Sequence, residues 1–282
     1  MIFSRYELPV VSGHGRGRLL GYPTFNLVIP EGFELPFGIY AAWAWIGDVR
    51  YGAAMHYGPI PVFDDPKPSL ELFLLDYKDD DSIVDILGVE PVRYLREIRP
   101  FASPENLAEA IGNDVLVTRE YLADRQLLDY LADEASSYPR FEDGRIDYTD
   151  TPSAAGVGIF LEHDGKLLLV KRSEKVGSYK GRWHVVSGYL DEPVSLREKA
   201  EEELREELSL TLPSTLEWLF GPGFRSQDGH LLLFSCLIRL KSVPEITLDW
   251  ENTEYSWVDI TEIVRFDPVP SCLQEWAHLL AL

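Results

Sequence analysis

The chain has 282 residues, of which 45% are hydrophobic and 26% charged, so a mainly disordered state is excluded and two domains are expected. Its 47 acidic residues against 26 basic ones give a net charge of −21, spread over both halves. Such a field repels phosphodiester backbones and anionic lipid surfaces, which argues against nucleic acid and membrane as partners. The two cysteines form no CxxC motif, which excludes a disulfide framework and makes a cytoplasmic location the expectation.

The first hundred residues alternate short extended runs with turns rich in Gly and Pro. Strands are expected in four stretches, 10–11, 40–46, 51–56 and 70–77. Many short strands with this punctuation indicate a small barrel or sandwich.

Helical signals begin at Ser103, which is a suitable N-cap before Pro104. Apolar residues then recur on one helical face, with an expected break at Gly112-Asn113. An acidic helix is expected over 121–135. We therefore predict a first domain that ends with helical structure.

A polar, turn-rich stretch predicts a linker at 136–152, between a domain at 1–135 and a domain at 153–282. The second domain begins with two strands joined by an Asp164-Gly165 hairpin turn. A long charged helix follows at 195–207. Two more strands and a C-terminal helix complete an α+β pattern.

The stretch Gly13–Asn26 gathers glycines, arginines and hydroxyl or amide side chains. Its alternating glycines let the backbone approach a phosphate closely and present N–H groups to it. The GxGxG spacing is neither a dinucleotide fingerprint nor a Walker A loop. A basic, flexible β-turn is the alternative interpretation.

This stretch resembles the riboflavin kinase (flavokinase) signature, GxGRGxxLGxPTxN. Similarity continues at 58–63, where Val62 replaces the usual Thr, along the glutamate-bearing strand 70–77, and at 94–103. The resemblance covers about residues 5–120. It departs from the family at 79–83, where Asp-Asp-Asp-Ser-Ile stands in the flavin-side loop.

The resemblance implies a six-stranded antiparallel Greek-key barrel that transfers the γ-phosphoryl group of ATP to the 5′-hydroxyl of riboflavin, yielding FMN and ADP. It assigns Glu71 as the base and gives Mg²⁺ (or Mn²⁺) to Thr24 and Asn26. Nucleotide binding falls to Gly13, Gly15, Arg16, Gly17, Arg18 and Pro23. For Glu71, the alternative interpretation is a solvent-facing residue of an edge strand.

A second candidate site lies on the helix at 196–208, which carries many glutamates. Glu203, Glu206 and Glu207 stand at i, i+3 and i+4, which places their carboxylates on one face. Such like charges repel unless a cation is shared, and oxygen ligands favour Mg²⁺ or Mn²⁺ over zinc. The alternative is a solvated acidic face balanced by Lys and Arg on the same helix.

The wider pattern, counted from Gly188 and covering about residues 147–282, resembles the Nudix box. The resemblance implies an α/β/α sandwich in which Glu203, Glu206 and Glu207 bind metal and catalyse hydrolysis of a nucleoside diphosphate derivative. The chain departs from the box at three positions, Val194, Glu202 and Ser209. The second matters most, because the family has there an Arg that orients a metal-binding Glu. Arg205 is a candidate substitute.

Three interpretations stay open: a kinase joined to a Nudix hydrolase, a non-catalytic flavin or nucleotide sensor, and a protein in which only the Nudix domain is active. No module for adenylyl transfer to FMN is recognised, so FMN rather than FAD is the expected product. Conversion of riboflavin to FMN would separate an enzyme from a sensor.

Overall fold

The computed structural model describes residues 4–13, 16–60, 65–78, 83–280 and 282. Its contacts divide the chain into two compact units, Met1–Leu122 and Ala123–Leu282. The domain limits expected above, including the linker at 136–152, stay a prediction.

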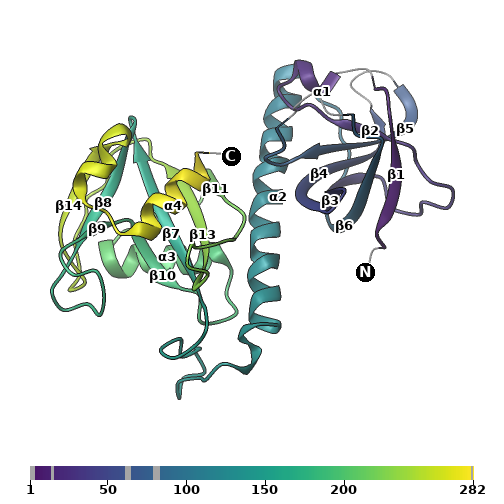
Figure 1. The fold of residues 1–282 in the computed structure, drawn as a ribbon. Helices are drawn as coiled ribbons and strands as arrows, with labels where there is room; N and C mark the ends of the chain where they lie inside the picture. Colours follow the sequence, from purple (N-terminus) through teal and green to yellow (C-terminus); the bar gives the residue numbers. More distant parts are fainter. Residues whose placement is uncertain (1–3, 14–15, 61–64, 79–82, 281) are drawn as a thin grey trace. The chain divides into compact units, whose positions relative to one another are not determined.

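Six antiparallel strands close into a barrel in the first unit (Figure 1). They run around the barrel in the order β1-β2-β5-β4-β3-β6, and β1 pairs with β6. The predicted six-stranded antiparallel barrel is confirmed. In chain order the strands are β1 (Tyr6–Val11), β2 (Phe25–Leu27), β3 (Gly38–Ile46), β4 (Val49–Ile60), β5 (Asp65–Leu74) and β6 (Ile86–Arg96).

Closure of the barrel decides where Glu71 lies. Its strand, β5, pairs with β2 on one side and β4 on the other. The alternative interpretation of an edge strand is therefore wrong. Because side chains alternate along a strand, Leu70 and Leu72 are buried in the barrel core, whereas Glu71 faces outward.

A long helix, α2 (Pro104–Ala132), covers part of this outer face through Val115 and Leu122. The helix is continuous, so the expected break at Gly112-Asn113 and the separate helix at 121–135 are wrong. A Cβ atom at residue 112 would lie 2.8 Å from the hydroxyl of Tyr22. We infer that glycine serves close packing here rather than helix termination.

The second unit contains a mixed sheet with the order β11-β13-β7-β8-β14. The pair β13 and β7 is parallel, and the other pairs along this path are antiparallel. The path is built from β7 (Ala154–His163), β8 (Lys166–Arg172), β11 (Trp218–Phe220), β13 (Leu231–Arg239) and β14 (Asn252–Asp259), and the short strands β9 (Trp183–His184), β10 (Val186–Tyr189) and β12 (Phe224–Arg225) pair with it.

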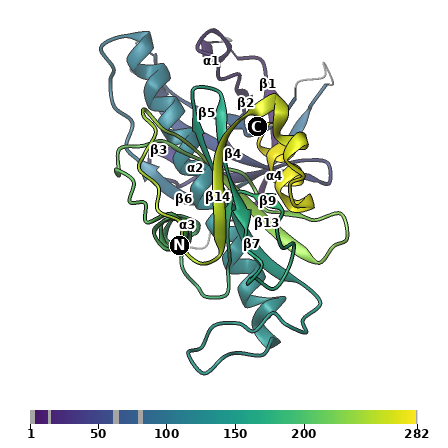
Figure 2. The same cartoon turned by 90° about the vertical axis from the view of Figure 1, so that its left-hand side faces the viewer.

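Helices cover both faces of this sheet (Figure 2). On one face α3 (Leu196–Leu208) packs through its apolar side, together with Leu127 and Tyr130 of α2. On the other face α4 (Pro270–Leu279) packs through Trp276. The predicted α/β/α sandwich is confirmed. No helix in the described part of the chain is long and apolar enough to span a membrane.

Candidate functional site

In the first unit, Glu71 lies at the meeting point of three strands. Its carboxylate accepts a hydrogen bond from the Thr24 hydroxyl (Oγ1 to Oε2, 3.0 Å) and one from the Ser69 hydroxyl (Oγ to Oε1, 3.3 Å). Across the sheet, Glu71 pairs in register with Asn26 on β2 and with His56 on β4. Directly opposed residues of antiparallel strands share a face, so these side chains lie on the outer face of the barrel.

A largely apolar cavity opens beside this carboxylate. Thr24, His56 and Glu71 line it together with apolar side chains such as Phe73 and Ile111. Burial lowers the pKa of His56, and the negative charge of Glu71 opposes this shift in part. Within the described ranges, Nδ1 of His56 has no hydrogen-bond partner. The cavity thus places the Glu71 carboxylate and the imidazole of His56 in a largely apolar wall.

An ion pair closes another part of the cavity wall. Arg96 donates to Asp114 of α2 in a bidentate arrangement, with Nε to Oδ1 at 2.7 Å and Nη2 to Oδ2 at 2.6 Å. Both side chains are largely buried. This pair ties the end of β6 to the helix that covers the barrel.

A more polar groove adjoins the cavity, and Thr24 lines both. The groove is lined by Gly13, Arg18, Pro23 and Asn26 among others. The short helix α1 (Arg16–Leu19) lies between Gly13 and Pro23 in the chain. After this helix the backbone turns at Gly21, whose φ is +85°. The glycine-rich stretch therefore lies next to Glu71, on the side of Thr24.

Glycine is required by close contacts in this stretch. A Cβ atom at Gly13 would overlap the amide of Asn26, and one at Gly17 would overlap the carbonyl oxygen of Tyr22. Gly15 and the side chain of Arg16 lie outside the described residues, as do Val62 and residues 79–82. The structure thus brings together those predicted site residues that it describes. The roles of these residues stay a prediction.

The oxygen donors here fit a divalent cation held with phosphate. The hydroxyl of Thr24 and the side-chain amide of Asn26 supply the hard oxygens that Mg²⁺ prefers. Two donors fill only part of the octahedral shell of Mg²⁺, which leaves coordination positions for phosphate oxygens.

In the second unit, Glu207 is the most buried of the predicted metal ligands. Its carboxylate accepts hydrogen bonds from the Ser187 backbone N–H at 3.2 Å and from Asn252 Nδ2 at 2.6 Å. The other end of the Asn252 amide, Oδ1, lies 3.1 Å from Nε2 of the buried His184. Burial raises the pKa of Glu207 to about 8, although the hydrogen bonds from Asn252 and Ser187 lower it.

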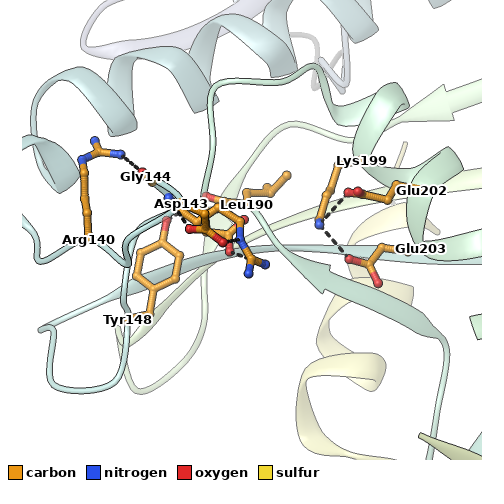
Figure 3. A network of polar contacts seen from close by, with 10 residues as sticks. Arg140, Asp143, Gly144, Tyr148, Leu190, Lys199, Glu202 and Glu203 are labelled. Atoms are coloured by element: carbon orange, nitrogen blue, oxygen red, sulfur yellow. Dashed lines mark hydrogen bonds and ion pairs between the residues drawn. The ribbon is translucent and has the colours of Figure 1, made fainter. Parts of the chain in front are cut away.

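Glu203 lies one helical turn away, over the backbone of Gly188. Its Oε1 is 3.0 Å from Nζ of Lys199, which also lies 2.8 Å from Glu202 Oε2 (Figure 3). Burial raises the pKa of Glu203 to about 7, while the charge of Lys199 lowers it. A Cβ atom at residue 188 would overlap the Glu203 carboxylate, which explains a glycine at the first position of the box.

The third carboxylate, Glu206, is exposed on the same helix. Within the described ranges, no three His, Cys, Asp or Glu side chains converge closely enough to hold a metal ion as they lie. The donor chemistry fits Mg²⁺ or Mn²⁺, since all three are carboxylates on one helix face. Glu203 instead contacts Lys199, and Glu207 instead contacts Asn252. The assignment of the three glutamates as metal ligands therefore stays a prediction.

The loop that enters α3 is fixed by the stretch predicted as a linker. Tyr148 donates its hydroxyl to the carbonyl of Leu190 at 2.8 Å (Figure 3). The N–H of Ile146 donates to the carbonyl of Asp191. The helix itself begins with a capping box between Ser195 and Glu198. These contacts set the register of α3 and hence the directions of its glutamates.

Sequence reasoning missed several contacts of the predicted residues. Lys199 was expected only to balance the acidic helix, although i, i+4 spacing brings it to Glu203 in particular. Asn252 follows Glu207 by 45 residues, and no spacing rule signals their contact. Ser69, His56 and the Arg96–Asp114 pair depend on strand register and helix packing in the same way.

Comparison with known proteins finds a matching family model for each half of the chain. Residues 4–122 match the family model for riboflavin kinase, and residues 151–279 match the model of the NUDIX domain. A riboflavin kinase of Mus musculus is 35% identical over 120 residues, which is 40% of this chain and 77% of the relative. One of Homo sapiens is 36% identical over 113 residues, 38% of this chain and 72% of the relative.

Among solved structures, a MutT protein from Methanosarcina mazei Go1 aligns with 45% of this chain and 91% of its own. The sequence identity is 22% and the TM-score 0.36.

Proposed function

Because the chain belongs to the riboflavin kinase family and carries a NUDIX domain after its kinase domain, we propose that its first unit phosphorylates riboflavin with ATP to give FMN and ADP. The observation that carries this proposal is the position of Glu71. Its carboxylate lines the apolar cavity, which adjoins the groove lined by Gly13, Arg18 and Asn26, among others.

Each residue has a chemical task in this reaction. The apolar cavity takes the flavin ring, and the groove takes the phosphates, with Arg18 adding positive charge in an acidic protein. Glu71 accepts the proton of the 5′-hydroxyl as its oxygen attacks the γ-phosphorus, and ADP leaves. Bound Mg²⁺, held by Thr24 and Asn26, would neutralise charge on the transferred phosphoryl group.

The hydrogen bonds on Glu71 support its role as a positioned base. Thr24 and Ser69 hold one oxygen each, which fixes the plane of the carboxylate. Each oxygen keeps a lone pair for a substrate hydroxyl. Thr24 links the base to the groove, so proton acceptance and phosphate binding occur side by side.

Incubation of the full chain with riboflavin and Mg-ATP, followed by chromatography of the flavins, tests this function. We expect FMN, and we expect Glu71→Gln to lower its rate by about 10²- to 10⁴-fold. Glu109→Gln is the matched control, since Glu109 is exposed on α2 and does not line the cavity. Quenching of riboflavin fluorescence without FMN formation would instead identify a flavin sensor.

For the second unit we propose hydrolysis of a nucleoside diphosphate derivative in the presence of Mg²⁺ or Mn²⁺. The supporting observation is that two carboxyl groups of one helix face, the buried Glu207 and the largely buried Glu203, lie close to the box glycine, with pKa values that burial raises to about 8 and about 7. Raised carboxyl pKa values within one cluster are typical of sites that bind cations or move protons. Glu206 is the exposed third member of the same helix face.

A panel of ADP-linked compounds, assayed with Mn²⁺ for release of nucleoside monophosphate, tests this second activity. We expect turnover that is lost on addition of EDTA and in Glu206→Gln. Glu201→Gln is the matched control, because Glu201 is another exposed glutamate of α3. Binding of a nucleotide without turnover would favour a regulatory domain.

A further inference from the structure

Lys199 is the cation that contacts the acidic face of α3. Its Nζ lies 2.8 Å from Glu202 Oε2 and 3.0 Å from Glu203 Oε1, and its side chain is only 9% exposed (Figure 3). Burial lowers the pKa of Lys199, but the hydrogen bonds and charges of Glu202 and Glu203 outweigh it, and the net shift is upward. The ammonium group is therefore charged and shared by two carboxylates.

Helical geometry selects this lysine over the nearby arginine. Residues three and four positions apart lie side by side on a helix, so Lys199 reaches both Glu202 and Glu203. Arg205 follows Glu203 by two positions and is exposed, on another side of the helix. This arrangement does not favour the sequence-based suggestion that Arg205 replaces the family Arg in orienting a metal-binding Glu, at least for Glu203.

Different partners hold Glu203 and Glu207. Oε1 of Glu203 faces Lys199 and lies over Gly188, while Glu207 is hydrogen-bonded to Ser187 and Asn252. A divalent cation shared by these glutamates would need an oxygen of Glu203. In the arrangement described, an ammonium ion already neutralises that carboxylate.

We propose that Lys199 is an internal counter-ion which a divalent metal displaces from Glu203. The inference rests on the proposed metal-dependent function of the second unit. Lys199 keeps the metal-free helix stable by offsetting repulsion among its glutamates, and it lowers the affinity for metal by competing for Glu203. Lys199 neutralises part of the charge of Glu203, so metal binding and the Lys199–Glu203 contact oppose each other.

Glu202 makes this exchange feasible. A buried ammonium ion left without a partner would be strongly unfavourable. Glu202 holds Lys199 at 2.8 Å independently of Glu203, so the lysine stays paired after Glu203 turns away. The carboxylate at position 202, which departs from the Nudix box, gains a role through this contact.

The test uses the full chain and Mn²⁺ alone as the probe. Lys199→Met keeps the length of the side chain and removes the charge, and Lys199→Gln is a second neutral variant with a polar end. Arg205→Met is the matched control, since it removes one positive charge from the exposed side of the same helix. Mn²⁺ affinity is measured by calorimetric titration, and the unfolding temperature is measured in EDTA.

We expect both Lys199 variants to bind Mn²⁺ more tightly than the wild type by about fivefold or more, since about fivefold is the upper range for exposed ion pairs and this pair is largely buried. We also expect them to unfold at lower temperature in EDTA, and Arg205→Met to match the wild type in both measurements. Tighter Mn²⁺ binding together with a lower unfolding temperature identifies a competing counter-ion, because loss of a merely structural lysine would not tighten metal binding.

Two results would overturn the inference. If the wild type binds Mn²⁺ and the Lys199 variants bind it equally or more weakly, the lysine positions Glu203 for the metal or is neutral, while the proposed metal-dependent function survives. If neither the wild type nor the variants bind Mn²⁺, the inference fails together with that function.

Discussion

Asn252 donates a hydrogen bond of 2.6 Å to Glu207, and its carbonyl oxygen lies 3.1 Å from Nε2 of His184. Burial lowers the pKa of His184 to about 4, so the ring is neutral at pH 7. Its Nε2 therefore donates to Asn252, whose amide then presents its N–H₂ group to Glu207. Side chains from two strands, β9 and β14, thus hold Glu207, a candidate metal ligand on α3, in place.

Replacing Asn252 with Leu is expected to lower the free energy of unfolding by about 1–3 kcal/mol, because it leaves a buried carboxyl group and a buried imidazole without their partner. Urea denaturation at pH 7 measures the change. Thr253→Val is the control, since the neighbouring Thr253 is exposed. Equal stability of Asn252→Leu and the wild type would show that the contact chain does not hold Glu207.

The ion pair between Arg96 and Asp114 is expected to stabilise the first unit. Arg96→Met removes two charge-assisted hydrogen bonds and should lower the free energy of unfolding by about 1.5–3 kcal/mol. Glu97→Gln serves as the control, because Glu97 directly follows the same strand and is exposed. A double-mutant cycle with Asp114→Asn measures the coupling, and additive effects would contradict a direct interaction.

Gly17→Ala is expected to impair FMN formation by about 10²-fold without unfolding the chain, because the added Cβ overlaps the carbonyl of Tyr22 and displaces the segment that leads to Thr24. The flavin chromatography described above measures the rate, and circular dichroism checks the fold. Gly177→Ala is the control, since its Cβ would meet no atom within 4 Å. An unchanged rate would separate the glycine-rich stretch from phosphate binding.

Stability should fall as pH rises because of Glu275, a residue of α4 that is 3% exposed. Burial raises the pKa of its carboxyl group from 4.5 to about 8. Between these values the unfolded chain has released the proton and the folded chain retains it, so the stability contributed by the neutral form is present below pH 4.5 and is lost as pH rises towards 8.

Glu275→Gln removes this titration, and its free energy of unfolding should fall less than that of the wild type between pH 5 and pH 8. We expect the difference to exceed about 1.4 kcal/mol, the equivalent of one pKa unit. Urea midpoints at the two pH values measure it, with exposed Glu245→Gln as the control. Parallel pH profiles for the wild type and Glu275→Gln would refute the assignment.

Local sequence patterns predicted the elements but not their contacts. Short strands and turn residues indicated a barrel or a sandwich, and the family resemblance implied the barrel. Helical spacing placed Glu203, Glu206 and Glu207 on one face of α3. The predicted break at Gly112 was wrong because the residue's packing partner, Tyr22, lies 90 positions earlier in the chain, and helix propensity carries no information about such a partner.

The same limit applies to the candidate sites. Thr24 and Glu71 could be named from motifs, whereas Ser69 and His56 join them only through the pairing of β4 with β5 and the conformation of one carboxylate. Lys199 was counted among the charges that balance the acidic helix. Its selective contact with Glu202 and Glu203 requires side-chain conformations, which sequence spacing permits but does not determine.

The continuity of α2 has a practical consequence for anyone who wants to isolate either half. A cut after Leu122, where the compact units divide, falls inside the helix that runs from Pro104 to Ala132. The second fragment would keep Leu127 and Tyr130 for the core that α3 also covers, but on a helix that has lost its N-terminal turns, while the barrel would end in a severed helix. Fragments intended to fold alone should each carry their own copy of these shared turns.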